Sequence, residues 1–379
     1  MTRGELTKMI DLAKRLLAAG EPGVLSTLFS SNGSTYRPLG SMMVSGPATL
    51  TVGGISGGCL EQYVARTGRS LTQQKRAAML SFDADPEHDD GSKPVLGCGG
   101  SIEVLVERLS ECHVEFLQSF AQAMSADELS IATCIIAIRD GQVSKVSRTS
   151  PSPGTPGEGW GGGSRSQASS FDQPLIEPPP YPSPRVLEEG KSASPTFGRQ
   201  RTLIHNIPPV TRLVIFGAGD DVQPLVEVAH RLDWHVTVVD RRSRLAIADR
   251  FPQADLVIGD DWGVAIERVK FTPNTAVVLM THSLVDDIEI VPLIQDKPMF
   301  YTGSLGPEHR REWVIDGALQ TTTLSESFIA RFRGPIGLNL GDRTAMGIAV
   351  SITAEVLAEL NHRNAASLSH PTPRARLSI

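Results

Sequence analysis

The chain has 379 residues, which predicts two or three domains. Its charged fraction of 21% and hydrophobic fraction of 40% are those of an ordinary globular protein, and its net charge of −6 argues against a nucleic-acid binder. Four cysteines cannot form a disulfide framework, the first residues lack a signal-peptide core, and no apolar run is long enough to span a membrane. We therefore expect a cytoplasmic α/β protein without nucleic-acid or membrane partners.

Residues 1–148 begin with a predicted amphipathic helix and continue as a series of short strands. The helix is predicted from one stripe of apolar residues, made of Leu6, Met9, Ile10, Ala13, Leu16 and Leu17. Short apolar runs predict strands at 24–29, 41–45, 49–56, 77–82, 101–109 and 131–139. Helical stretches after Cys59 and over 114–124 interrupt these runs, so we expect an N-terminal mixed α/β domain over 1–148.

Residues 149–200 differ sharply in composition from the rest of the chain. These 52 residues hold 10 of the 26 prolines, contain few apolar residues and lack any helical or strand period. Such a segment cannot bury enough surface to offset chain entropy, so we predict a disordered linker or insertion. A docking site for a proline-reading partner at PPPYPSP is the alternative.

The last large part of the chain, 201–362, alternates strands with helices in a regular way that begins near Val210. Strands are predicted at 212–216, 234–240, 254–260, 275–282 and 297–304, and helices at 221–232, 242–251 and 342–360. This alternation is typical of a parallel sheet with helices on both faces, so we expect a C-terminal Rossmann-like domain. Residues 363–379 are polar and are expected to form a flexible tail.

A glycine turn follows the first predicted strand of the second domain. Gly217 and Gly219 are placed to make the tight turn and the close approach that a bound pyrophosphate needs, and Asp240 stands where the ribose-binding acid is expected. The third glycine of the dinucleotide pattern is replaced by Val222, and Asp220 and Asp221 place two negative charges where a phosphate would dock. The turn therefore predicts a Rossmann topology, with NAD(P) binding or glycines kept for packing alone as the two alternatives.

The four cysteines differ in their surroundings. Cys134 lies in an apolar run and is interpreted as a core residue, whereas Cys112 lies in a polar stretch with no supporting pattern. Cys59 follows Gly57 and Gly58 and precedes a helix, and Cys98 is surrounded by Gly97, Gly99 and Gly100. A thiol beside exposed backbone N–H groups at a helix start is a nucleophile or a soft ligand for a metal or for sulfur. Two buried thiols, a disulfide and a structural zinc site remain the alternatives.

Arg37 lies in a loop bounded by Gly33 and Gly40. In this position the guanidinium either pairs with a phosphate or carboxylate or stays solvated.

Eight stretches together resemble the xanthine dehydrogenase accessory factor (XdhC/CoxI) family. They are GSTYRPLGSMMV (33–44), GGISGGCLE (53–61), VLGCGGSIEVLVE (95–107), RLVIFGAG (212–219), VTVVDRR (236–242), LMTHSLVDD (279–287), YTGSLG (301–306) and GPIGLNLGDRTAMGIAVSITAEVL (334–357). They cover both domains and leave 149–200 uncovered. Two departures are Asp220, where such proteins commonly have histidine, and the 52-residue segment itself.

The resemblance implies a non-catalytic chaperone that binds the molybdenum cofactor (molybdopterin) and assists its sulfuration and its insertion into a molybdenum hydroxylase of the xanthine dehydrogenase type. The implied partners are that hydroxylase and a cysteine desulfurase, with a homodimer left open. By the same resemblance, Arg37, Glu61, Cys59 and Cys98 with their neighbouring glycines are the cofactor-binding positions, and the two cysteines are candidates to contact molybdenum or its sulfur.

Two further hypotheses come from other features of the sequence. An NAD(P)-dependent oxidoreductase is suggested by Gly217, Gly219 and Asp240, with His282 as the best candidate proton donor. A scaffold that joins a desulfurase to a hydroxylase without binding a small molecule is the third hypothesis.

Overall fold

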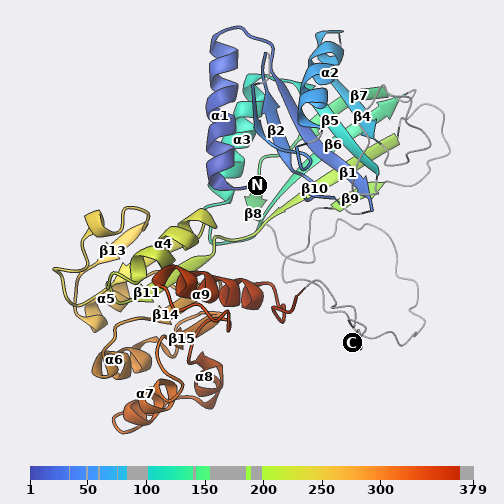
Figure 1. Ribbon diagram of the computed structural model, residues 1–379. Helices are drawn as coiled ribbons and strands as arrows, with labels where there is room; N and C mark the ends of the chain where they lie inside the picture. The colour runs from blue at the N-terminus through green and yellow to red at the C-terminus, as the bar shows by residue number, and fades with distance from the viewer. Residues whose placement is uncertain are drawn as a thin grey trace, which may run out of the picture. The chain divides into compact units, whose positions relative to one another are not determined.

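The structure of the protein is a computed structural model. It describes all residues of the chain except 34, 48–49, 59, 75, 83–100, 140–141, 154–184, 189–198 and 368–379. The chain divides into two compact units, Met1–Pro209 and Val210–Ile379 (Figure 1). No helix among the described residues has the length and apolar character needed to cross a membrane.

The first unit contains an antiparallel sheet with the strand order β3-β2-β1-β5-β4. The strands are β1 (Val24–Asn32), β2 (Met42–Ser45), β3 (Thr51–Gly53), β4 (Ala77–Phe82) and β5 (Ser101–Arg108). Alternate residues of these strands face opposite sides of the sheet, so each side needs its own cover. All five strands were expected from the apolar runs.

Helices and a second sheet provide that cover. Val64 of α2 (Glu61–Gln74) packs with Val24 and Val106 on one face of the sheet. On the other face, α1 (Arg3–Ala18) and α3 (Glu111–Ala123) pack through Leu6 and Phe116. The predicted apolar stripe of α1 is buried, with Leu17 at its edge, and Thr2 and Glu5 form a capping box that begins the helix.

The second sheet of this unit has the strand order β7-β6-β10-β9, and β8 pairs with β6. The strands are β6 (Ser130–Arg139), β7 (Gln142–Arg148), β8 (Ser152–Pro153), β9 (Arg185–Glu188) and β10 (Arg199–Ile207). Cys134 and Leu203 of this sheet pack against Phe29 and Leu105 of the first sheet. The two sheets therefore share a core.

This second sheet corrects the expected domain boundaries. β10 pairs with β6 from Arg199 to Ile207, so the first unit ends at Pro209, and not before residue 201. β8 and β9 fall inside the segment 149–200, so that segment is not one uninterrupted linker. Residues 154–184 and 189–198 of that segment, which include the PPPYPSP motif, and residues 368–379 of the expected tail lie outside the described residues.

The second unit is a six-stranded parallel sheet in the order β13-β12-β11-β14-β15-β16. The strands are β11 (Arg212–Phe216), β12 (His235–Val239), β13 (Leu256–Ile258), β14 (Thr275–Leu279), β15 (Tyr301–Ser304) and β16 (Phe332–Arg333). This is the doubly wound order, in which the chain leaves the centre of the sheet first on one side and then on the other. The predicted Rossmann-like topology is confirmed, and its switch point lies between β11 and β14.

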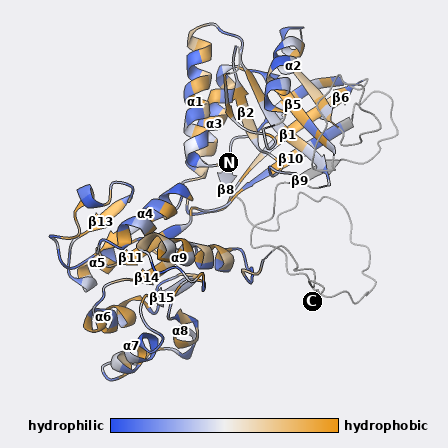
Figure 2. Ribbon diagram, in the orientation of Figure 1, coloured by the Kyte–Doolittle hydropathy of each residue, from blue (hydrophilic) through white to orange (hydrophobic). Residues whose placement is uncertain are grey.

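Helices cover both faces of this sheet, and in Figure 2 helices such as α4 and α9 carry both hydrophobic and hydrophilic residues, as expected of helices with one face on a core. Leu213 and Ile215 face α4 (Val222–Arg231) and α9 (Ala345–Leu360). Val214 and Phe216 face a core built with α5 (Trp262–Arg268), α6 (Leu284–Ile294), α7 (Arg310–Leu319) and α8 (Glu326–Arg331). The helix predicted over 242–251 is wrong: the backbone is extended at Ile247, and only a single 3₁₀ turn forms at Ala248–Arg250.

Candidate functional site

The loop between β3 and α2 is folded around the carboxylate of Glu61. The backbone N–H groups of Ile55 and Ser56 donate to its Oε1 over 3.2 and 2.9 Å. The Ser56 hydroxyl and the Leu60 N–H donate to its Oε2 over 2.7 and 3.2 Å. Burial would raise the pKa of Glu61, but these hydrogen bonds outweigh it and hold the pKa below its ordinary value. Glu61 therefore organises the glycine loop from within.

The loop between β3 and α2 brings four predicted site residues together: it contains Gly57 and Gly58, ends at Glu61 and lies beside Arg37. A Cβ atom on Gly54 would lie 3.4 Å from Glu61 Oε1 and 3.5 Å from Arg37 Nη2, so both charged groups lie beside the same stretch of backbone. The Arg37 guanidinium is also 3.4 Å from Glu5, and its side chain is 36% exposed. Gly58 adopts a φ of +111°, a backbone conformation that favours glycine over other residues.

An exposed aromatic ring adjoins the glycines. Tyr36 is 70% exposed, and its ring lies 3.3 Å from the position that a Cβ on Gly57 would take. The sequence offered no signal for this contact, because Tyr36 and Gly57 are separated by two strands. Together the exposed ring, the two exposed glycines and the Arg37 guanidinium form a surface suited to a planar anion.

The predicted cysteine sites are only partly tested. Cys59 and the whole Gly97–Gly100 motif lie outside the described residues, so their roles remain predictions. Cys134 is buried and its pKa is raised to about 11 by burial, as expected of a core thiol. Cys112 is exposed in the first turn of α3. Within the described parts of the chain, no three His, Cys, Asp or Glu side chains gather as metal ligands.

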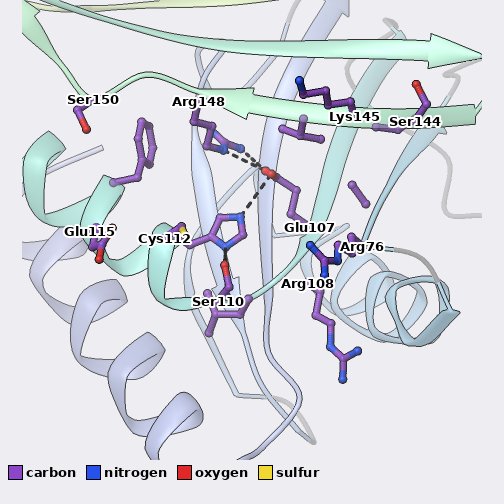
Figure 3. Close-up of a pocket in the computed structure, with 16 residues that line it drawn as sticks. Arg76, Glu107, Arg108, Ser110, Cys112, Glu115, Ser144, Lys145, Arg148 and Ser150 are labelled. Atoms are coloured by element: carbon purple, nitrogen blue, oxygen red, sulfur yellow. Dashed lines mark hydrogen bonds and ion pairs between the residues drawn. The ribbon is translucent and has the colours of Figure 1, made fainter.

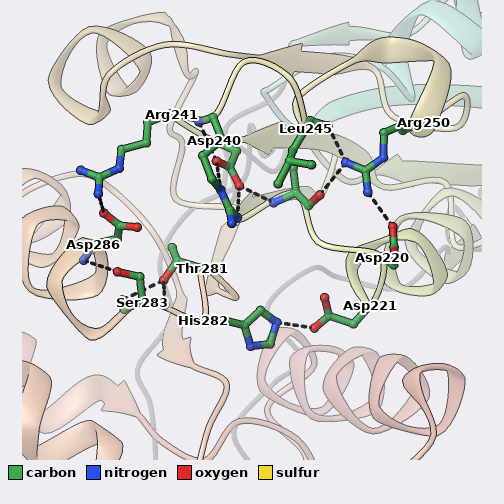
Figure 4. Close-up of polar contacts among 12 residues, drawn as sticks. Asp220, Asp221, Asp240, Arg241, Leu245, Arg250, Thr281, His282, Ser283 and Asp286 are labelled. Atoms are coloured by element: carbon green, nitrogen blue, oxygen red, sulfur yellow. Dashed lines mark hydrogen bonds and ion pairs between the residues drawn. The ribbon is translucent and has the colours of Figure 1, made fainter.

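The second candidate region is the switch point at the carboxyl ends of β11 and β14 (Figure 4). Gly217 has a φ of +123°, and a Cβ there would lie 2.2 Å from the carbonyl oxygen of Met280. This glycine is thus required for the close packing of the two strand ends. Ligands of doubly wound folds bind at such a switch point.

Asp240 reaches the glycine turn, as the sequence predicted, but protein donors surround its carboxylate. It accepts hydrogen bonds from the Ala218 N–H at 2.8 Å and from the Arg242 N–H, Nε and Nη2 at 2.8, 2.9 and 2.7 Å. Burial alone would raise its pKa, but these donors hold it below its ordinary value. Because Asp240 is only 1% exposed, a ribose would have to displace Arg242 to bind this carboxylate.

Protein groups neutralise the two carboxylates at the start of α4. Arg250 donates to Asp220 Oδ1 over 2.7 Å and also binds the Ala218 carbonyl oxygen over 2.8 Å. The Nε2 atom of His282 lies 2.8 Å from Asp221 Oδ2, which joins the end of β14 to the start of α4. This hydrogen bond raises the pKa of His282, and it lowers that of Asp221 against the effect of burial.

The neighbouring arginines are paired with carboxylates. Arg241 lies 2.7 Å from Asp286 Oδ1, and Arg242 is bound to Asp240. A 2′-phosphate would have to compete with these carboxylates for either guanidinium. The switch point is therefore a network of paired charged side chains, in which Asp220 is 93% exposed and His282 is 59% exposed.

Comparisons with known proteins agree with this two-unit organisation. Residues 213–356 match the XdhC Rossmann domain, and residues 16–83 match the XdhC and CoxI family. The chain therefore belongs to the XdhC and CoxI family.

Individual relatives extend over nearly the whole chain. The chain is 26% identical to a probable xanthine dehydrogenase subunit of Bacillus subtilis (strain 168), over 93% of this chain and 97% of that protein. It is 22% identical to the molybdenum cofactor insertion chaperone PaoD of Escherichia coli (strain K12), over 96% of this chain and 92% of that one. A crystal structure of a xanthine dehydrogenase from Bacillus halodurans has a TM-score of 0.67 at 24% identity and covers 98% of both chains, which shows the shared fold.

Proposed function

We propose that the chain binds the molybdenum cofactor as cargo, assists its sulfuration and inserts it into a molybdenum hydroxylase of the xanthine dehydrogenase type. The observation that carries the proposal is the glycine loop held by Glu61 beside Arg37. Family membership and the name of the relative PaoD support the same role. The hydroxylase and a cysteine desulfurase are the proposed partners, and a second copy of the chain is a further candidate.

Each group of the loop has a distinct proposed role. Arg37 exchanges its 3.4 Å contact with Glu5 for the phosphate of molybdopterin, because a guanidinium offers a phosphate two parallel hydrogen bonds. The exposed ring of Tyr36 stacks on the planar pterin, and Gly57 and Gly58 leave room for it. Glu61 acts as a positioning residue, since loop donors already surround its carboxylate. Cys59 and Cys98 are proposed to contact molybdenum or to carry its sulfur.

The test measures molybdopterin retained by the full chain after purification from a molybdopterin-producing host. We expect Cys59→Ala or Cys98→Ala to lower the retained amount at least about 10-fold, which corresponds to about 1.4 kcal/mol. Cys112→Ala is the matched control and should retain as much as the unaltered chain, because Cys112 lies away from the glycine motifs in the sequence. Equal retention in all three variants would overturn the cysteine roles.

An NAD(P)-dependent oxidoreductase is the second candidate function. It is favoured by His282, an exposed proton donor held by Asp221 at the switch point. The pairing of Asp240 with Arg242 and of Arg241 with Asp286 works against it. Calorimetric titration with NADH and NADPH decides the matter: saturable heat that Asp240→Ala removes would support this function, and the absence of heat would exclude it.

A further inference from the structure

The first unit contains a cavity of about 900 Å³ that neither candidate site includes (Figure 3). Its walls come from the start of β4, the end of β5, the start of α3 and the length of β7. All of its lining residues fall between positions 76 and 150, so it is formed within a single unit. Its volume is sufficient for a small organic molecule.

Glu107 lies at the centre of a buried polar group in this cavity. Its carboxylate pairs with the Arg148 guanidinium, whose Nε donates over 3.1 Å, and lies 3.4 Å from His113 Nε2. His113 Nδ1 accepts a hydrogen bond from the Ser110 N–H, so Nε2 is assigned the proton that faces Glu107. Burial would raise the pKa of Glu107, but Arg148 and His113 hold it at about 2. The carboxylate is therefore ionised and neutralises one positive charge.

Arg148 keeps an unused donor at this position. Its side chain is 8% exposed, and its Nη1 atom has no hydrogen-bond partner in the part of the chain that the structure describes. A buried donor without a partner is unfavourable, and more so when the group is charged. A ligand that supplies an acceptor here would remove that penalty.

Three more cationic side chains line the cavity. Arg76, Arg108 and Lys145 are exposed, and within the described ranges none of them has an ion pair or a side-chain hydrogen bond. In Figure 3, Lys145 and Arg148 lie on one side of Glu107, and Arg76 and Arg108 lie on the other. Apart from Glu107, the only acidic side chain among the lining residues is Glu115, so the cavity has a positive net charge.

Apolar groups form part of the same wall. Phe116, which lies under the Arg148 guanidinium at 5.1 Å, is joined by Leu109 and Val146. A ligand that fits both parts of this wall combines an anionic group with an aromatic or apolar body.

We propose that this cavity binds a small phosphate monoester whose organic part is aromatic or apolar. Arginine guanidinium groups and a lysine ammonium donate hydrogen bonds to the oxygens of a phosphate dianion. The two negative charges of the dianion neutralise three unpaired cations better than the one charge of a carboxylate does. The apolar wall favours an ester over inorganic phosphate. The residues that line this cavity do not include Arg37, Gly57, Gly58 or Glu61, so the proposal concerns a separate site and does not depend on the cofactor role.

The first test is calorimetric titration of the full chain, purified free of molybdopterin, with phenyl phosphate, inorganic phosphate and phenol. Phenyl phosphate is expected to bind tightest, inorganic phosphate more weakly, and phenol without measurable heat. Absence of phenyl phosphate binding at millimolar concentration would overturn the site, and equal affinity for the ester and inorganic phosphate would overturn the role of the apolar wall.

Paired variants test the location. Arg76→Gln combined with Lys145→Gln should weaken phenyl phosphate binding about 10-fold or more. Arg66→Gln combined with Lys14→Gln removes the same charge from exposed helical positions of the same unit and should leave the affinity unchanged. Equal weakening in both pairs would show a general effect of net charge and would contradict the assignment.

Cys112 supplies an independent readout because its exposed thiol lines the cavity. Bound phenyl phosphate should slow alkylation of Cys112 by iodoacetamide several-fold, as followed by peptide mass mapping. Binding without any change in this rate would place the ligand elsewhere. A failure of molybdopterin retention would leave this result untouched, so the two proposals fail separately.

Discussion

At the scale of single residues, the same types of side chain serve different purposes in the two units. The Glu61 carboxylate holds a loop by accepting four hydrogen bonds, whereas Asp240 holds a turn and also neutralises an arginine. The sequence predicted that both acids are important positions. It did not predict that protein donors surround them, because such pairing depends on how the chain leaves a strand or enters a helix.

Glu61→Gln should loosen the glycine loop. The amide keeps one acceptor oxygen but loses the charge that strengthens the bonds from Ser56, so we expect a loss of about 1–2 kcal/mol in the free energy of unfolding. Glu111→Gln is the matched control, because Glu111 is also the first residue of a helix but is exposed. Urea unfolding measures both variants. An equal effect of the two substitutions would mean that Glu61 acts only on the helix dipole.

The Asp221–His282 pair predicts a pH effect with a defined sign. The pKa of His282 is raised above its ordinary value of 6.5, so the pair's contribution to stability is present below that value and is lost as pH rises through the raised pKa. Asp221→Asn should lower the pKa of His282 toward its ordinary value, as measured by NMR titration of the ring. Asp220→Asn, which breaks the contact with Arg250 instead, should shift it less. The opposite ranking would contradict the pairing.

At the scale of elements, most strands were predictable because a buried strand needs a continuous or alternating apolar run. The failures have local causes. Residues 242–251 have a helical pattern, but Arg250 turns back to bind the Leu245 carbonyl and Asp220. α6 was not predicted because the turn after β14 leads into a mostly apolar helix that contains Pro292. β10 follows a segment without periodicity, and its place in the first unit depends on a distant partner, β6.

Three glycines of the second unit should respond differently to substitution by alanine, because an added Cβ would meet different surroundings at each. The Cβ of Gly217→Ala would lie 2.2 Å from a backbone oxygen, and residue 217 has a positive φ. We therefore expect the free energy of unfolding to fall by about 3 kcal/mol or more. Gly263→Ala in α5 meets nothing within 4 Å and should be neutral or slightly stabilising. The Cβ of Gly219→Ala would lie 2.5 Å from the Asp221 carboxylate and 3.9 Å from the His282 ring, which are side chains and not backbone, so its effect should fall between the other two.

Urea unfolding followed by tryptophan fluorescence reports mainly on the second unit, which holds three of the four tryptophans, Trp234, Trp262 and Trp313. If Gly217→Ala were no more destabilising than Gly263→Ala, the close packing at the switch point would be wrong.

At the scale of the whole molecule, composition predicted two parts but not their boundary. The sequence suggested that the proline-rich segment separates two domains. The structure instead places β9 and β10, which follow most of that segment, in the second sheet of the first unit. The part of the segment between β8 and β9 thus connects two strands of one unit, and the junction of the two units falls at Pro209–Val210.

Fragments of the chain test this boundary. Residues 1–209 should unfold cooperatively in urea, because the fragment retains the pairing of β10 with β6. Residues 1–198 lack β10 and expose the edge of β6, so this fragment should aggregate or lose cooperativity. Cooperative unfolding of both fragments with the same midpoint would contradict the assignment of β10 to the first unit.

The proposed cofactor site of the first unit is the loop beside Arg37 that Gly57, Gly58 and Glu61 form. Equilibrium dialysis of isolated cofactor against the full chain, Arg37→Gln and the matched control Arg66→Gln tests it most directly. We expect measurable binding by the unaltered chain and by Arg66→Gln, and an affinity that is weaker by about 10-fold or more for Arg37→Gln. Equal affinity of the two variants, or no binding by the unaltered chain, would contradict it.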